Sequence, residues 1–261
     1  MLRSRIIPCL LVRNKGLVKT VGFADAKYVG DPINAVRIFN EKEVDELMVI
    51  DIDATVQGRS PDYDLIGRLA AECRMPLCYG GGVKTRAQIE KIVALGVEKV
   101  ALSSAIVESS CLVAEASSSV GAQSIVAVLD VKKAPSERRY EVYTHNGTRP
   151  TGKCPVATAK LLEEQGVGEI ALNSIDNDGR MEGYDFDLIE LVSRQIRRPI
   201  TCLGGAGSLG DIEKLIVRFG PIGAAAGSLF VFKGAYRAVL INYPSQSVKE
   251  ALFRKWQSTH E

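Results

Sequence analysis

The sequence repeats itself at about half its length, and this repeat constrains the fold more than any other feature. Residues 30–53 run through a helical pattern, an acidic turn, an apolar strand and Ile-Asp, and residues 154–179 give the same order. The glycine-rich stretch at 76–83 has a counterpart at 199–207. A repeat of this size, built of strand and helix units, is typical of two half-barrels fused into one closed sheet.

Eight short apolar runs alternate with amphipathic segments, which predicts a parallel sheet covered by helices. We therefore predict a single (β/α)8 barrel domain over residues 1–261. An open dinucleotide-binding sheet is the competitor, but neither GGGV nor GGAG matches its GxGxxG turn. The expected strands are 5–12, 46–52, 77–79, 99–102, 124–130, 169–173, 200–203 and 223–226. The clearest helical patterns are 32–40, 86–95, 156–165, 187–195 and 211–219.

Two segments depart from the strand–helix unit. Residues 13–31 form a long first loop, and residues 138–152 alternate polar and apolar side chains around Asn146-Gly147. The second segment predicts a β-hairpin with a tight primed turn, inserted after the fifth strand. Loops on the carboxyl side of barrel strands cover substrates, so both segments are expected to border the site.

Charge and cysteine content exclude several classes of protein. The net charge is +2 and the basic residues are scattered, so nothing favours nucleic acid. No long apolar run or signal peptide is evident, so we expect a cytoplasmic protein that does not enter a membrane. The six cysteines form no CxxC pair and only two histidines accompany them. We interpret them as buried thiols and expect no metal or cofactor.

The carboxyl ends of barrel strands meet on one face, where active sites are built. The residues at these ends are Asp51, Asp53, Gly80, Gly81, Gly82, Ser103, Ser104, Asp130, Asp176, Asp178, Gly204, Gly205, Gly227 and Ser228. Glycine lets backbone N–H groups approach an anion, and a following helix adds the positive end of its dipole. The two Gly/Ser clusters therefore predict two phosphate cradles and an elongated ligand with a phosphate at each end. In the alternative reading, these glycines only satisfy tight turns.

Asp130 ends an apolar strand, where burial can raise a carboxyl pKa toward neutrality and suit it to proton transfer. The alternative is a structural carboxylate that ties down Lys132 or Lys133. The internal symmetry predicts a second aspartate at the end of the first strand. That position holds Leu11.

The motifs RIIPCL, VDELMVIDIDA, YGGGV, EKVALSSAIVE, GEIALNSIDNDG and GGAG resemble, in order and spacing, the HisF family. HisF is the cyclase subunit of imidazole glycerol phosphate synthase, and the resemblance covers essentially the whole chain. It implies a barrel that takes ammonia from a HisH-like glutaminase and combines it with a bisphosphorylated nucleotide. The products are imidazole glycerol phosphate and an aminoimidazole carboxamide ribotide.

The resemblance also implies roles for individual residues. The catalytic or neighbouring active-site positions are Asp130, Asp51, Lys19 and Asp178. The first phosphate site comprises Gly82, Ser103 and Ser104, and the second comprises Gly179, Gly205, Ala226, Gly227 and Ser228. The ring of charges that gates ammonia entry comprises Arg5, Glu46, Lys99 and Glu169.

These four charged residues stand at the amino-terminal side of their strands. Two acids and two bases converging there could form a simple salt-bridge plug. They occur beside Asp45 and Glu98, which match the family's docking surface. We therefore expect a glutaminase subunit on the amino-terminal face of the barrel.

Leu11 is the main departure from the resemblance, because family members carry a catalytic aspartate there and a leucine transfers no protons. Asn173, where the family usually has threonine, is a milder departure.

The favoured hypothesis is that the chain is a HisF paralogue. It would pass ammonia to a sugar amidotransferase reaction that forms an acetamidino sugar of a surface polysaccharide. The alternatives are an orthodox cyclase using Asp130 with Asp51 or Asp178, and a non-catalytic scaffold for the glutaminase. The sister isomerase HisA is disfavoured, since it needs the first-strand aspartate and no ammonia gate.

Overall fold

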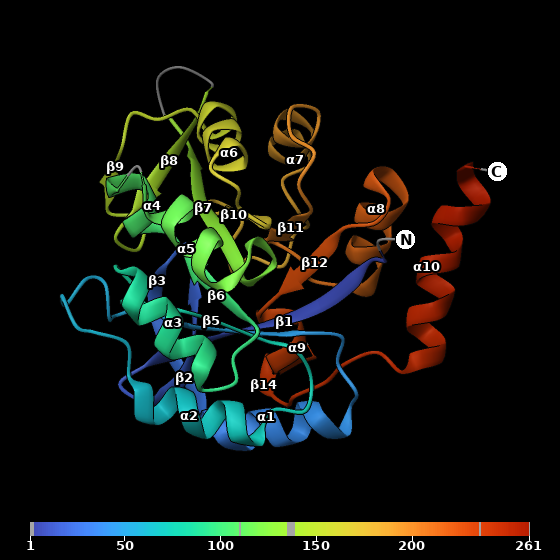
Figure 1. Ribbon diagram of the computed structural model, residues 1–261. Helices are drawn as coiled ribbons and strands as arrows, with labels where there is room; N and C mark the ends of the chain where they lie inside the picture. Colours follow the sequence, from blue (N-terminus) through green and yellow to red (C-terminus); the bar gives the residue numbers. More distant parts are fainter. Residues whose placement is uncertain (1–2, 110, 135–138, 235, 261) are drawn as a thin grey trace.

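The computed structural model describes residues 3–109, 111–134, 139–234 and 236–260, which form the predicted (β/α)8 barrel (Figure 1). The eight parallel strands pair in the ring order β1, β4, β5, β6, β7, β10, β11 and β12, and β12 pairs with β1 to close it. Each half of the repeat supplies four neighbouring strands, as the sequence predicts. Strands β1 and β7 are four steps apart in either direction, so they face each other across the barrel.

The observed strand and helix bounds differ from the predicted ones by a few residues at most. The barrel strands are β1 (Arg5–Arg13), β4 (Leu47–Asp51), β5 (Leu77–Gly80), β6 (Lys99–Leu102), β7 (Ile125–Lys133), β10 (Glu169–Ser174), β11 (Ile200–Leu203) and β12 (Gly223–Ala226). The helices are α1 (Pro32–Glu41), α2 (Tyr63–Glu72), α3 (Arg86–Ala94), α4 (Ser104–Glu108), α5 (Leu112–Val120), α6 (Pro155–Glu164), α7 (Phe186–Ser193), α8 (Leu209–Phe219), α9 (Ser228–Val231) and α10 (Gln246–His260).

Local sequence signals explain where the helices begin. Asp31 caps α1 and Pro32 occupies its first turn, where the missing N–H costs nothing. Thr85 and Ser208 form capping boxes at the starts of α3 and α8. These signals fix the first residues of the three helices.

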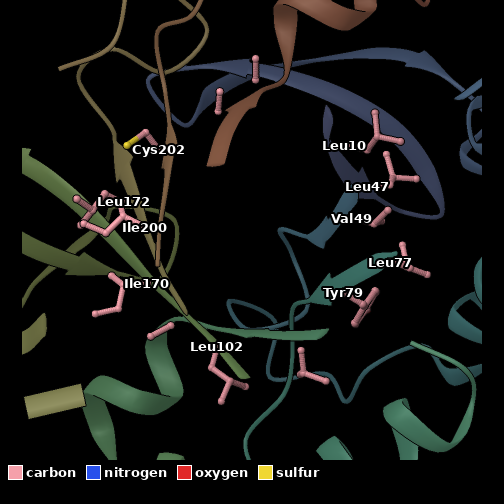
Figure 2. Close-up of a cluster of buried hydrophobic side chains, with 14 of the residues drawn as sticks. Leu10, Leu47, Val49, Leu77, Tyr79, Leu102, Ile170, Leu172, Ile200 and Cys202 are labelled. Carbon is pink, nitrogen blue, oxygen red and sulfur yellow. The ribbon is translucent and has the colours of Figure 1, made fainter. Parts of the chain in front are cut away.

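The apolar side chains form two layers. The outer layer lies between strands and helices and includes Leu10, Val49, Tyr79 and Leu172 (Figure 2). The inner layer fills the barrel itself, with Ile7, Cys9, Met48, Cys78, Ala101, Val126, Val128, Ala171 and Ala225. Alternation along each strand separates the two layers.

The predicted long first loop is wrong, because residues 13–31 are largely strand. Strand β2 (Gly16–Val21) continues antiparallel from β1 and pairs with β3 (Ala24–Gly30). After β7, strand β8 (Tyr140–Thr144) pairs antiparallel with β7, and the short β9 (Arg149–Pro150) pairs with β8. Asn146 and Gly147 have positive φ at the β8–β9 turn, while residue 138 lies outside the described residues.

The C-terminal region adds a small hairpin and a final helix. Strands β13 (Phe232–Lys233) and β14 (Ala238–Val239) pair antiparallel, and α10 lies beside α8 near the N-terminus (Figure 1). The expectation of six buried thiols is wrong for Cys111 and Cys154, which are exposed, while Cys73 is half-buried. In the described ranges, no cluster of His, Cys, Asp or Glu is placed to hold a metal ion, and no helix could span a membrane.

Candidate functional site

A cavity opens at the carboxyl ends of the barrel strands, and it gathers every residue that the sequence assigned to catalysis or phosphate binding. Asp53 and Asp176, also at strand ends, do not line it, because Asp53 pairs with Arg13 and Asp176 accepts the Lys133 N–H. The predicted residues in its wall are Lys19, Asp51, Gly82, Ser103, Ser104, Asp130, Asp178, Gly179, Gly205, Ala226, Gly227 and Ser228.

Asp130 is held by one hydrogen bond to each carboxylate oxygen. Asn173 Nδ2 donates to Oδ1 at 2.8 Å, and Ser103 Oγ donates to Oδ2 at 2.9 Å. Burial raises the Asp130 pKa to about 6 against the lowering effect of these two donors. A carboxyl that titrates near neutral pH can take up and release protons under working conditions.

Asp178 and Lys19 form a second polar group in the same cavity. Asp178 accepts hydrogen bonds from Thr20 Oγ1 at 2.9 Å and from the Phe23 N–H, and burial raises its pKa. Lys19 Nζ donates to the Cys9 carbonyl at 2.5 Å, and burial lowers the lysine pKa. Lys19 lies on β2, and Thr20 of β2 binds Asp178. The segment that the sequence predicted to be a loop therefore positions part of the site.

Asp51 ends β4 and is tied into the following turn. Its Oδ1 accepts the N–H groups of Asp53 and Ala54 at 3.0 Å, and Arg59 approaches Oδ2 at 3.5 Å. These donors keep the carboxylate buried and fixed, so Asp51 forms part of the cavity wall beside Gly81.

Leu11 lies on β1, opposite the strand that carries Asp130, and it lines the same cavity. Its register partners are Ile50 on β4 and Val18 on β2. Leu11, Ile50 and Leu203 pack against the inner apolar layer, and all three line the cavity. The wall facing Asp130 therefore lacks a proton-transferring group at the position where the symmetry predicted one.

The glycines of the predicted phosphate cradles are required by close backbone contacts. A Cβ on Gly82 would come within 2.7 Å of the Arg59 carbonyl, and one on Gly205 within 2.0 Å of the Gly183 carbonyl. Both residues have positive φ. The turn-forming role and the phosphate-binding role therefore fit the same glycines.

Two short helices start directly at these clusters. Helix α4 follows Ser103 and α9 follows Gly227, and within the described chain neither start has a side-chain cap. Their first N–H groups can therefore serve an anion. Ser103 Oγ donates to Asp130 and Ser104 Oγ accepts the His145 N–H, while the phosphate-binding role of both serines stays a prediction.

Sequence reasoning missed several cavity residues on the two hairpins. Asn146, at the β8–β9 turn, donates to the Ile52 carbonyl at 2.6 Å, and Phe23 lies at the β2–β3 turn. Phe23 has a φ of +66°, an uncommon conformation for a bulky residue. Only its position at a tight Gly-Phe turn could have signalled this.

The four predicted gate residues form a closed ring of ion pairs at the opposite end of the barrel. Arg5 pairs with Glu46 and, at 2.8 Å, with Glu169, while Lys99 pairs with both acids at 2.9 Å. Burial alone would raise the Glu169 pKa, but Arg5 and Lys99 lower it to about 2. We call these four residues the charge ring.

The charge ring and the cavity are connected along the strands. On β10, Glu169, Ala171 and Asn173 follow one another on the inward face, and on β7 the inward residues at the same levels are Val126, Val128 and Asp130. The layer between the two sites is apolar.

Asp45 and Glu98, expected on a docking surface, are already engaged within the chain. Asp45 Oδ1 pairs with Lys249 of α10 at 2.7 Å, and its Oδ2 accepts the Ile6 N–H. Glu98 Oε2 accepts the Leu77 N–H at 2.8 Å. Their carboxylates therefore fix the edge of the charge ring.

Fold and site together define a (β/α)8-barrel protein with a cavity that holds Asp130 between two glycine clusters and a ring of charges at the opposite end of the barrel. The chain belongs to the histidine biosynthesis protein family, which matches residues 5–237, and within this family it is HisF-like. HisF is the cyclase subunit of imidazole glycerol phosphate synthase.

Three relatives match almost end to end. A Leptospira borgpetersenii protein named "Putative imidazole glycerol phosphate synthase subunit HisF" is 56% identical over 253 residues, which is 97% of this chain and 100% of the relative. The corresponding hisF3 protein of Vibrio vulnificus is 56% identical over 250 residues, 96% of each chain. The hisF2 protein of Pseudomonas aeruginosa is 50% identical over 244 residues, 94% of this chain and 97% of the relative.

Proposed function

We propose that this chain is the ammonia-using barrel subunit of a glutamine amidotransferase, and that its acceptor differs from the nucleotide of histidine synthesis. The favoured acceptor is an acetamido sugar of a surface polysaccharide, converted into an acetamidino sugar with a sugar amidotransferase. Ammonia comes from a HisH-like glutaminase docked at the amino-terminal face. The observation that carries the proposal is the contrast between an intact charge ring and a leucine facing Asp130.

Delivery through the barrel follows from the two layers beneath the cavity. The charge ring is held by four ion pairs, so opening it requires a partner or a rearrangement of Arg5 or Lys99. The layer above the ring is apolar, which disfavours an ammonium ion but admits neutral ammonia. A partner bound at the amino-terminal face therefore supplies the nitrogen as neutral ammonia, the form that can cross the apolar layer.

Altered acceptor chemistry follows from Leu11. A positioned acid or base contributes about 10²- to 10⁴-fold to a rate, so a cyclase reaction that needs two such groups is slowed by that order here. Two of the relatives carry the numbered names hisF2 and hisF3, and numbered names support the interpretation of this chain as a paralogue. A second copy is free to serve a different pathway.

The orthodox cyclase is the second candidate. Asp130 retains a pKa near 6, and Asp178, whose pKa is also raised by burial, lines the same cavity. If Asp178 or Asp51 supplies the missing proton transfer, the bisphosphate nucleotide remains the substrate. The third candidate is a non-catalytic scaffold for the glutaminase. If it is correct, phosphorylated compounds do not bind at Gly82 and Gly205.

Gate variants test the delivery step. In the complex with glutaminase and sugar amidotransferase, Lys99→Ala should lower the amidine formed per glutamine hydrolysed at least several-fold, measured by mass spectrometry. Arg37→Ala, which removes an exposed ion pair to Glu72, is the matched control and should leave that ratio unchanged. An unchanged ratio in Lys99→Ala and in Glu46→Ala would refute delivery through the charge ring.

A further inference from the structure

Asn173 carries a buried polar atom that the site described above does not use. The residue is 6% exposed and lines the cavity, and its Oδ1 has no hydrogen-bond partner among the described residues. A buried carbonyl oxygen without a donor is costly and uncommon. Such an atom at the wall of a cavity points to a ligand that donates a hydrogen bond.

The orientation of the Asn173 amide is fixed by Asp130. An ionised carboxylate only accepts, so the group within 2.8 Å of Asp130 Oδ1 must be the NH2 of Asn173. The carbonyl oxygen Oδ1 is therefore not the atom in contact with Asp130 Oδ1. It lies 3.3 Å from the place where a Cβ on Gly204 would stand, on the β11 side of the cavity.

Asp130 and Asn173 are the first polar groups above the apolar layer. They are register partners on β7 and β10, and the inward residues one level below, Val128 and Ala171, are both apolar. A small molecule that rises through the barrel from the charge ring meets these two side chains before any other polar side chain on the inward face of either strand.

We propose that Asn173 Oδ1 and the Asp130 carboxylate together bind the ammonia nitrogen, each accepting one N–H. The two acceptors are separated by one amide group and one hydrogen bond, a gap that a single nitrogen about 2.9 Å from each can bridge. Ammonia has several N–H groups and one lone pair, so two bonds fix its orientation and leave the lone pair free. The inference rests on the proposed function for the source of ammonia, while the site itself is formed by this chain alone.

The experiment is a titration of the purified chain with ammonium chloride, followed by NMR of the backbone amide of Gly204 and the side-chain amide of Asn173. Sodium chloride and potassium chloride at equal ionic strength are the salt controls. We expect saturable shifts with ammonium only. Equal shifts with potassium would indicate a general cation site and would overturn the proposal, as would no saturable shift.

Variants separate this role from a structural one. Asn173→Leu removes the carbonyl at similar size and should weaken the ammonium dissociation constant about tenfold, the loss expected for one hydrogen bond. Asn173→Ala is the second variant if leucine disturbs folding, and it should give the same loss because it also removes the acceptor. Asn146→Leu removes another amide of the cavity wall and should leave the constant unchanged. Inorganic phosphate should bind all three variants as it binds the natural chain.

Unaltered ammonium affinity in both Asn173 variants would overturn the nitrogen site. This outcome is distinct from failure of the proposed function, because the titration involves no glutaminase and no acceptor. If ammonium binds as expected while Lys99→Ala leaves delivery intact, the nitrogen site stands and the proposed route through the charge ring falls.

Discussion

Asp130 and Leu11 show how one residue sets the chemistry available to the whole cavity. Asp130 is tuned by burial between Asn173 and Ser103, so its carboxyl titrates near neutral pH. Leu11 occupies the facing strand and continues the apolar wall formed with Ile50 and Leu203. The cavity therefore has a carboxyl group with a raised pKa on β7 and an apolar side chain on β1 opposite it.

The raised pKa of Asp130 predicts a stability cost at neutral pH. The pKa is 3.8 in an ordinary setting and about 6 in the folded chain, so the folded state binds more protons between these values and stability falls as pH rises through them. Asp130→Asn should therefore stabilise the protein by about 1–3 kcal/mol at pH 7. The gain should vanish below about pH 4, where both states are protonated.

Urea unfolding at both pH values measures this effect. The asparagine can still accept from Asn173 and donate to Ser103, so the variant removes the charge with little change in packing. A variant that is less stable than the natural chain at pH 7 would show that Asp130 is a structural carboxylate.

The sequence was informative about single residues wherever a strand end fixed their position. Leu11 is recognisable as a departure because the internal repeat predicts an aspartate at its position. The contacts of Asn173 were not predictable, since the pairing of its amide with Asp130 depends on the register between β7 and β10. The hydrogen bond from Ser103 to Asp130 was not predictable either, since it also depends on how neighbouring strands are aligned.

At the scale of elements, the two hairpins complete the cavity. Strand β2 brings Lys19 and Thr20 to Asp178, and the β8–β9 turn brings Asn146 to Ile52. The barrel strands were predictable from their apolar runs, because those runs are buried on both faces. The first hairpin was not, because exposed residues of β3 give no apolar alternation.

The glycine clusters give a prediction at this scale. Gly205→Ala should lower the affinity for inorganic phosphate more than tenfold, because its Cβ would collide with the Gly183 carbonyl and displace the loop. Gly152→Ala is the control, since Gly152 also has positive φ but open space around it. Alanine there should cost about 1 kcal/mol of stability and leave phosphate affinity unchanged.

Isothermal titration with phosphate, together with thermal unfolding, distinguishes the two variants. Equal phosphate affinity in both would mean that the loop after β11 serves only the turn. This was the alternative that the sequence left open, because tight turns and anion cradles call for glycine at the same positions.

At the scale of the whole molecule, the two ends of the barrel differ in their chemistry. At one end, the four predicted gate residues form all four ion pairs of the charge ring, and Lys249 of α10 pairs with Asp45. At the other end, the cavity has two glycine clusters and Asp130 but a leucine on the facing strand. The fold was predictable at this scale because the repeat, the strand order and the apolar pattern agree.

The most direct test of this contrast is ammonium-dependent turnover of the bisphosphate nucleotide of histidine synthesis by the purified chain and by Leu11→Asp. We expect slow turnover by the natural chain and an increase of about 10² or more in the variant, because the second proton-transferring group is restored. Leu161→Asp, the same substitution at an exposed leucine of α6 away from the cavity, is the control and should give no increase. Rapid turnover by the natural chain that Leu11→Asp does not improve would contradict altered chemistry and make this barrel an ordinary cyclase.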